Sequence, residues 1–275
     1  MPENPVLKVK ELSAKTILSP CGLPEFEYSV NPYTGCSNGC KYCYARFMGK
    51  YSHQGEPWGS FVDVKTNSPE VLRKDLSKNK PGRIFLSSVT DCYQPLEAKY
   101  QLTRKVLEAI KDFQYPVSIL TKSSLAQRDL KIISGVKNCN FGMTICFLDE
   151  RDRRVLEPGA SPIKERLETL KLFSEIGIKT YAMLGPIMPG FSDRDIPLLF
   201  RQLSEAGVRD LIVDRLNIKC GNLQPILKTV KEYYPELVPL YQNLFQRGED
   251  KAYYQNLKKE IEKAAKENIS IDFCF

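Results

Sequence analysis

Short runs of β-branched or aromatic residues alternate with helical patterns through most of the chain, and this alternation limits the folds open to it. Strands and helices at this spacing favour a parallel sheet covered by helices, which is an α/β fold. Six such units predict a partial or open α/β barrel, since a full eight-unit barrel takes about 250 residues. The expected strands are 27–31, 83–88, 116–121, 140–147, 178–184 and 210–214, and the expected helices are 40–49, 100–113, 125–135, 162–176 and 193–206.

The segment 162–176 carries clear helical signals. Its apolar residues recur at helical spacing, at Ile163, Leu167, Leu170 and Phe173. Ser161 is expected to cap the helix, and Pro162 suits the first helical position because its missing N–H costs nothing there. Gly177 is expected to end the helix.

Roughly the last sixty residues follow a different pattern. An amphipathic helix is expected over 251–267, and a short final strand over 269–273. The predicted organisation is therefore an N-terminal extension (1–25), a core domain (26–220) and a mainly helical C-terminal extension (221–275).

The composition is that of an ordinary soluble globular protein, with 42% apolar and 27% charged residues. It excludes a collagen, a disordered acidic tail and a low-complexity scaffold. No run approaches the roughly 18 apolar residues that span a bilayer, so no membrane association is expected. The chain begins Met-Pro-Glu-Asn-Pro without an apolar signal core, which predicts a cytoplasmic protein. The net charge of +7 suits a phosphate-rich partner, but solubility explains it equally well.

The nine cysteines are more informative than the charge. Their odd number, in a chain of this length without a secretion signal, argues against a disulfide framework and favours metal or catalytic use. Three of them, Cys36, Cys40 and Cys43, crowd into eight residues directly after the first expected strand. Gly35 and Gly39 let the backbone of this loop fold tightly around a bulky ligand.

Three interpretations of the cysteine cluster are open from its residues. The first is a set of buried structural cysteines. The second is a zinc site with a fourth ligand from elsewhere, although His53 is the only histidine and no second cysteine pair follows. The third is an iron–sulfur cluster, in which three local thiolates would leave one iron open, as catalysis requires.

The Cys-x3-Cys-x-aromatic-Cys pattern, formed by Cys36, Cys40, Tyr42 and Cys43, resembles the motif of the radical S-adenosylmethionine (SAM) superfamily. More specifically, the chain resembles the branch related to spore photoproduct lyase. Further segments carry this resemblance in order along the chain: 31–36, 90–97, 120–123 with 128–130, 156–162 with Arg166, and 185–190.

The resemblance implies a fold and an activity. The fold is a partial (β/α)6 TIM-like barrel with the C-terminal helical extension added to it. The implied activity is that of a lyase-like radical SAM enzyme: a [4Fe–4S] cluster held by the three cysteines binds SAM, and its reduction cleaves SAM to a 5′-deoxyadenosyl radical that abstracts a hydrogen from a substrate. A small flavodoxin or ferredoxin is the implied electron donor, and a nucleic acid is one substrate class. The alternative is a non-catalytic module that binds zinc or a closed iron–sulfur cluster.

The resemblance also assigns cofactor contacts by position. Tyr42 would lie near the adenine of SAM, and Thr90 would hold its amino group. Lys122 would pair with the carboxylate of SAM, and Thr144 would contact its ribose or carboxylate. Each has a structural alternative: a core tyrosine, a turn-capping hydroxyl, a solvated lysine and a β-branched strand residue.

One position departs from the spore photoproduct lyase pattern. Ser88 stands where that family has a hydrogen-donating cysteine, and a hydroxyl is a far poorer hydrogen-atom donor than a thiol. Cys92 and Cys146 are the alternative hydrogen donors, with small buried apolar residues as the competing interpretation. The residues expected to contact the substrate are Asp91, Tyr93 and Gln94.

Overall fold

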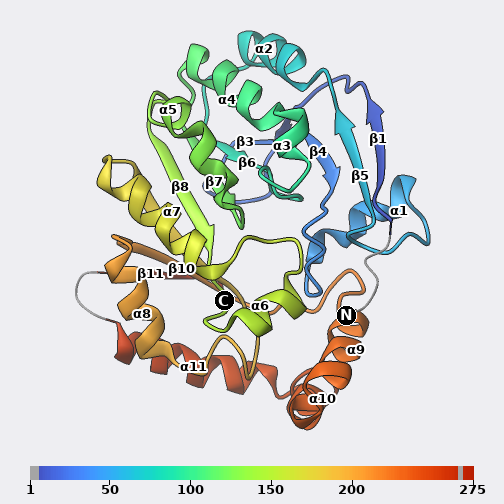
Figure 1. Ribbon diagram of the computed structural model, residues 1–275, viewed down its shortest axis with the longest axis vertical. Helices are drawn as coiled ribbons and strands as arrows, with labels where there is room; N and C mark the ends of the chain where they lie inside the picture. Colours follow the sequence, from blue (N-terminus) through green and yellow to red (C-terminus); the bar gives the residue numbers. More distant parts are fainter. Residues whose placement is uncertain (1–5, 266–268) are drawn as a thin grey trace.

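An eight-stranded sheet forms the centre of the computed structural model, which describes residues 6–265 and 269–275 (Figure 1). All neighbouring strands are parallel except the antiparallel pair β2 and β3. The strand order is β11 (Ser270–Phe273), β10 (Asp210–Arg215), β9 (Lys179–Ile187), β8 (Cys139–Thr144), β7 (Val117–Thr121), β6 (Ile84–Leu86), β3 (Tyr28–Val30) and β2 (Leu18–Pro20).

The six strands expected from the sequence are the six consecutive inner strands, β3 to β10 in this order. The α/β prediction is therefore confirmed. In the described part of the chain the sheet has two edges, β2 and β11, so the arrangement is that of an open barrel.

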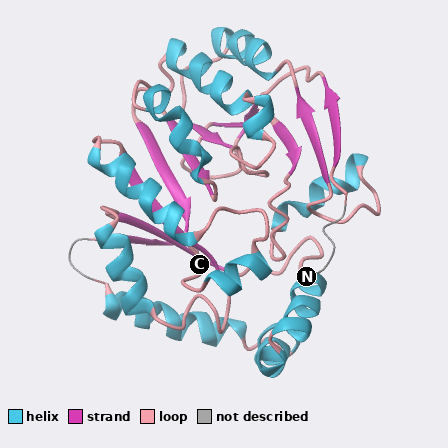
Figure 2. Cartoon of the chain, viewed as in Figure 1, coloured by secondary structure: helices cyan, strands magenta, loops and turns pink. Residues whose placement is uncertain are grey.

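Helices follow the convex side of the curved sheet, as Figures 1 and 2 show. The helix α7 packs on β8 and β9, where the rings of Phe141 and Phe173 stack with centroids 4.0 Å apart. The helices up to β10 are α1 (Gly49–Ser52), α2 (Ser68–Lys78), α3 (Glu97–Tyr100), α4 (Leu102–Phe113), α5 (Leu130–Ile133), α6 (Glu150–Leu156), α7 (Ile163–Glu175) and α8 (Ile196–Glu205), with the 3₁₀ helices η1 (Tyr44–Met48) and η2 (Ser124–Asp129).

Two local expectations were wrong. The helix expected over 40–49 is a loop as far as Cys43, followed by η1 and α1, because the backbone here turns on itself and packs against other segments. Ser161 does not cap α7, whose N-cap is Pro162. The Ser161 hydroxyl instead accepts a hydrogen bond of 2.9 Å from the backbone N–H of Ser124. Gly177 does end the helix as expected, because it directly follows the C-cap Ile176 and has a φ of +82°.

A second, three-stranded sheet was not expected from the sequence. Its order is β1 (Lys8–Leu12), β5 (Phe61–Lys65) and β4 (Tyr33–Gly35). The last residue of β4, Gly35, leads directly into Cys36 and has a φ of +84°. A Cβ there would lie 2.4 Å from the carbonyl oxygen of Phe61, so only glycine fits. This sheet therefore sets where the cysteine loop begins.

The C-terminal segment contains α9 (Leu223–Tyr233), η3 (Pro235–Leu237), α10 (Val238–Gln246) and α11 (Asp250–Ala264). The final strand, β11, pairs in parallel with β10, so this segment also extends the main sheet. Residues 266–268, which include the end of the last helix expected over 251–267, lie outside the described residues. The domain boundaries at 25 and 220 stay predictions. Among the helices described, none is long and apolar enough to cross a membrane.

Candidate active site at the cysteine loop

The three clustered cysteines lie on one loop between β4 and η1. Cys36 and Cys40 are each 7% exposed, and Cys43 is half-buried. Two turns shape the loop: the N–H of Gly39 donates to Cys36 O (3.3 Å), and that of Cys43 donates to Cys40 O (3.2 Å). Burial raises the pKa of the Cys36 thiol to about 12 and also raises the pKa of Cys40 and Cys43.

Thr90 and Gln94, in the segment after β6, brace one side of this loop. The Thr90 hydroxyl donates to the carbonyl of Gly35 (2.6 Å), and the Gln94 side-chain oxygen accepts from the N–H of Ser37 (2.9 Å). Gln94 Nε2 donates to Thr90 Oγ1 (3.1 Å), which joins the two braces. In this structure Thr90 thus holds the loop, and its contact with SAM stays a prediction.

Asp91 fastens the cysteine loop to the end of β7. Its carboxylate accepts from Asn38 Nδ2 (3.0 Å), from Thr121 Oγ1 (2.6 Å), and from the backbone N–H groups of Lys122 and Tyr93 (both 2.9 Å). Asp91, Tyr93 and Gln94 were expected to contact the substrate, but all three are buried in this structure. Their contact with a substrate stays a prediction.

The segment after α6 braces the opposite side of the loop. The N–H of Lys41 donates to Leu156 O (2.9 Å), and the N–H of Gly159 donates to Asn38 O (3.0 Å). A Cβ on Gly159 would lie only 2.6 Å from the carbonyl oxygen of Ser37. The two backbones are therefore in direct contact, which is only possible with glycine at this position.

Between these two backbone bonds lies a buried polar chain. The Tyr42 hydroxyl donates to Glu157 Oε1, and Arg166 Nη2 lies 2.6 Å from Glu157 Oε2. Burial, and then the charge of Glu157, raise the pKa of Tyr42 well above its ordinary value. Glu157 lies in one of the segments that carry the family resemblance, but no local pattern singles it out, since a glutamate in a loop is more often solvated.

Lys122 and Thr144 stand at the ends of the adjacent parallel strands β7 and β8. Lys122 Nζ donates to Thr144 Oγ1 (3.4 Å) and lies 6.0 Å from the centre of the Tyr42 ring. Burial lowers the pKa of Lys122, but the nearby Cys40 and Glu157 groups outweigh it and raise the pKa overall. The structure thus brings three predicted cofactor contacts together beside the cysteine loop.

The two predicted hydrogen donors are both buried. Cys92 is part of the hydrophobic core, and its carbonyl accepts from Thr103 Oγ1 (2.5 Å). Cys146 follows β8, and burial raises the pKa of its thiol to about 12. Ser88 is half-buried, with its hydroxyl oxygen 3.4 Å from Asn31 Nδ2. A role as hydrogen donor stays a prediction for both cysteines.

His53, the histidine of the zinc interpretation, is paired with carboxylates. Its Nε2 lies 3.1 Å from Asp63 Oδ2 and its Nδ1 lies 3.6 Å from Glu56 Oε2. Its ring stacks on Phe61 with centroids 4.0 Å apart. These contacts place His53 against the small sheet, where both of its nitrogens face oxygen atoms.

The chemistry of the loop fits an iron–sulfur cluster, which is ordinarily held by cysteine thiolates. Three free cysteines share one braced loop, and bound iron would stabilise the thiolates that burial disfavours. Within residues 6–265 and 269–275, no group of three or more His, Cys, Asp or Glu side chains is already arranged around a metal position. The fit therefore rests on the donor set and the loop.

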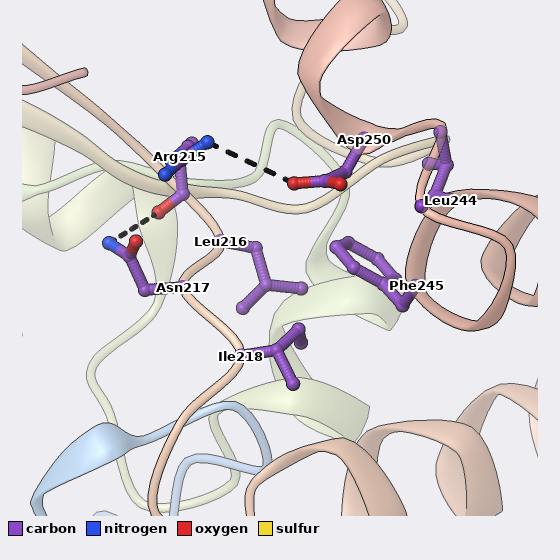
Figure 3. Close-up of a pocket in the computed structure, with 8 residues that line it drawn as sticks. Arg215, Leu216, Asn217, Ile218, Leu244, Phe245 and Asp250 are labelled. Atoms are coloured by element: carbon purple, nitrogen blue, oxygen red, sulfur yellow. Dashed lines mark hydrogen bonds and ion pairs between the residues drawn. The ribbon is translucent and has the colours of Figure 1, made fainter.

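A separate hollow of about 240 Å³ lies beyond the end of β10 (Figure 3). Arg215 and Asp250 form its polar side, with Arg215 Nη1 3.9 Å from Asp250 Oδ2. Its apolar wall consists of Leu216, Ile218, Leu244 and Phe245. The residues that line it do not include the cysteines or the predicted cofactor contacts.

Known proteins resemble this chain in sequence. The sequence model described as the radical SAM superfamily matches residues 30–203. An uncharacterized protein of Methanocaldococcus jannaschii is 38% identical over 190 residues, which cover 69% of this chain and 71% of that protein. An uncharacterized protein of Mycobacterium tuberculosis is 30% identical over 232 residues, which cover 81% of this chain and 68% of that protein. A protein of Pseudomonas phage M6 is named a radical SAM Nalpha-GlyT isomerase. It is 26% identical over 226 residues, which cover 78% of this chain and 45% of that protein.

Solved structures of spore photoproduct lyase resemble this chain in fold. The complex of that enzyme with dinucleoside spore photoproduct gives a TM-score of 0.60 at 18% identity, covering 82% of this chain and 66% of the other. A variant with bound AdoMet and the same dinucleoside gives a TM-score of 0.61 at 19% identity. At these identities the likeness shows the fold, and it confirms the α/β architecture expected from the sequence.

Proposed function

The chain belongs to the radical SAM superfamily, and from that premise we propose that Cys36, Cys40 and Cys43 hold a [4Fe–4S] cluster at which SAM is cleaved. When bound, such a cluster supplies the electron that splits the sulfonium of SAM into methionine and a 5′-deoxyadenosyl radical, which then takes a hydrogen atom from the substrate. The observation that carries the proposal is the cysteine loop itself, held on both sides and flanked by a half-buried cation, Lys122.

The residues beside the loop have separate tasks in this proposal. Lys122 offers a positive charge to the carboxylate of SAM at the end of β7. Thr144 orients the Lys122 ammonium group through the 3.4 Å contact between them. Tyr42 presents its ring and backbone to the adenine, with its hydroxyl fixed by Glu157. Tyr42 and Thr144 are buried and Lys122 is half-buried, so water has limited access to these groups and their electrostatic interactions with SAM are strengthened.

Three protein thiolates would leave one iron of the cluster without a protein ligand. SAM would bind at that iron, as an open catalytic metal site requires. The electron would come from a small flavodoxin or ferredoxin. We propose a nucleic acid as the substrate class, on the support of the dinucleoside ligand named for the spore photoproduct lyase structure; the net charge of +7 is compatible with it. The presence of Ser88 argues against repair of the spore photoproduct by the cysteine-dependent route.

The test is anaerobic. The protein is reconstituted with iron and sulfide, reduced with dithionite and mixed with SAM, and 5′-deoxyadenosine is measured by chromatography and mass spectrometry. The parent should form it, whereas Cys40→Ala should not. Cys139→Ala, a change of another buried cysteine, should behave as the parent. Uptake of zinc with no iron, or loss of the metal in Cys92→Ala, would contradict the proposal and support a non-catalytic metal module.

The substrate class has its own test. Binding of single- and double-stranded oligonucleotides is measured by fluorescence anisotropy over a range of salt concentrations. A nucleic-acid substrate predicts a steep loss of affinity with salt, because phosphate contacts release counterions. A flat dependence on salt would contradict a nucleic-acid substrate and leave the radical chemistry untouched.

A further inference from the structure

A fully buried ion pair joins the loop after α6 to α7. The side chains of Glu157 and Arg166 are 0% and 1% exposed, and the pair is 2.6 Å long. Removing two charges from water is costly, and their attraction offsets this only when the remaining donors are also satisfied. Two further donors of Arg166 are satisfied, because Nε donates to Ser161 O (2.8 Å) and Nη1 donates to Thr144 O (3.0 Å).

The pair reaches the cysteine loop through a side chain. Glu157 accepts the hydroxyl of Tyr42, which lies between Cys40 and Cys43 in the sequence. The backbone bonds made by Leu156 and Gly159 lie on either side of Glu157 and hold the same loop. Glu157 is therefore a side-chain contact to the cysteine loop, placed between two backbone contacts to the same loop, and it holds the Tyr42 hydroxyl.

The same pair also reaches the predicted cofactor contacts. Arg166 holds the carbonyl of Thr144, and the hydroxyl of Thr144 accepts from Lys122. One buried carboxylate thus connects the cysteine loop with the ends of β7 and β8. Its charge lies in a poorly polarisable interior with little screening by water, although Arg166, 2.6 Å away, offsets part of it.

We propose that Glu157 is a positioning residue that orients Tyr42 for SAM. In the same proposal, its negative charge lowers the reduction potential of the cluster. This rests on the proposed function, since it needs a cluster on the cysteine loop. The physical reason for the second part is that adding an electron beside a fixed negative charge is unfavourable. Removal of that charge should make the cluster easier to reduce.

The experiment compares reconstituted parent, Glu157→Gln and Tyr42→Phe. Glu168→Gln is the matched control, because it removes the same charge from an exposed position of α7. Iron content is measured first, then the midpoint potential by a redox titration followed by electron paramagnetic resonance, and the Kd for SAM by equilibrium binding. None of these measurements depends on turnover.

Glu157→Gln should bind iron as the parent does, show a less negative midpoint potential and bind SAM about tenfold more weakly, the loss expected for a hydrogen bond to a charged group. Tyr42→Phe should weaken SAM binding by about the same factor without a shift of the potential. Glu168→Gln should change neither quantity.

The outcomes separate this proposal from the one on which it rests. A parent that takes up no iron overturns the proposed function and this inference with it. A loaded parent whose Glu157→Gln variant keeps both its potential and its SAM affinity overturns this inference alone. If Glu157→Gln does not fold because Arg166 is left unpaired, Tyr42→Phe decides, and an unchanged Kd for SAM overturns the role of the carboxylate in orienting Tyr42.

Discussion

Asn222 donates a hydrogen bond of 3.0 Å from Nδ2 to the backbone carbonyl of Tyr42, across 180 positions of sequence. Asn222 precedes α9, and its Oδ1 accepts from the N–H of Lys219 (3.0 Å). The segment after β10 is therefore fastened to the middle of the cysteine loop. A region predicted as a separate C-terminal extension thus contributes directly to the site.

The Asn222→Asp variant tests this connection. The carboxylate cannot donate to the buried carbonyl of Tyr42, so that oxygen loses its partner and faces a negative charge instead. We expect a loss of about 1–3 kcal/mol in the free energy of unfolding, measured with urea. Asn256→Asp, on the exposed side of α11, should change stability by less than about 0.5 kcal/mol. Equal effects of the two variants would contradict the structural role of Asn222.

The Gly159→Ala variant tests the contact between the two backbones. The new methyl group would lie 2.6 Å from Ser37 O, so the cysteine loop must shift, at a cost of about 1–3 kcal/mol. We expect lower thermal stability and less iron per chain after reconstitution. Gly22→Ala is the matched control, since its Cβ would meet nothing within 4 Å and its stability should be equal or slightly higher. Full iron content in Gly159→Ala would show that the loop tolerates the shift.

The Lys122→Met variant tests the cation beside the loop. Methionine keeps the length of the side chain but removes the charge that we assign to the SAM carboxylate. We expect SAM to bind about 10–100-fold more weakly, with the iron content unchanged. Lys131→Met removes the same charge from an exposed site on α5 and should bind SAM as the parent does. Parental affinity in Lys122→Met would rule out this assignment.

Asp75 gives a prediction about pH that is independent of the cofactors. Burial raises its pKa, but bonds from the backbone N–H groups of Ile17 and Leu18 and from the Thr16 hydroxyl outweigh this and lower the pKa overall. A lowered folded-state pKa adds stability above the unfolded value of about 3.9, and this stability is lost as the pH falls through the folded-state value. Asp75→Asn should therefore differ most from the parent near neutral pH, and the difference should shrink below about pH 4.

Thermal unfolding of the parent and of Asp75→Asn at several pH values measures this effect. Thr16→Val removes one of the bonds, 2.8 Å long, and keeps the two backbone bonds. It should show a smaller change over the same pH range. Stability curves of Asp75→Asn and the parent that run parallel down to about pH 3 would contradict the prediction.

Local patterns sufficed for the main sheet because its inner strands are short runs with β-branched or aromatic residues, such as Ile84–Leu86, between helical segments. The small sheet was not recognised, although its middle strand β5 carries a comparable run, Phe-Val-Asp-Val. Its strand β4 has three residues, too few to show a period, and β1 is largely exposed and charged. The helix expected over 40–49 was wrong for a related reason. Contacts with the segment after α6 determine that backbone, and they outweigh local helical preference.

The sequence by itself indicated the α/β class and the six inner strands, and it singled out the three clustered cysteines, because periodicity and spacing are properties of neighbouring residues. Only the tertiary structure decided that Glu157 and Asn222 belong to the site. Their bonds to Tyr42 join residues 115 and 180 positions apart. Such bonds exist only once the strands have brought the loops together, and no local pattern records them.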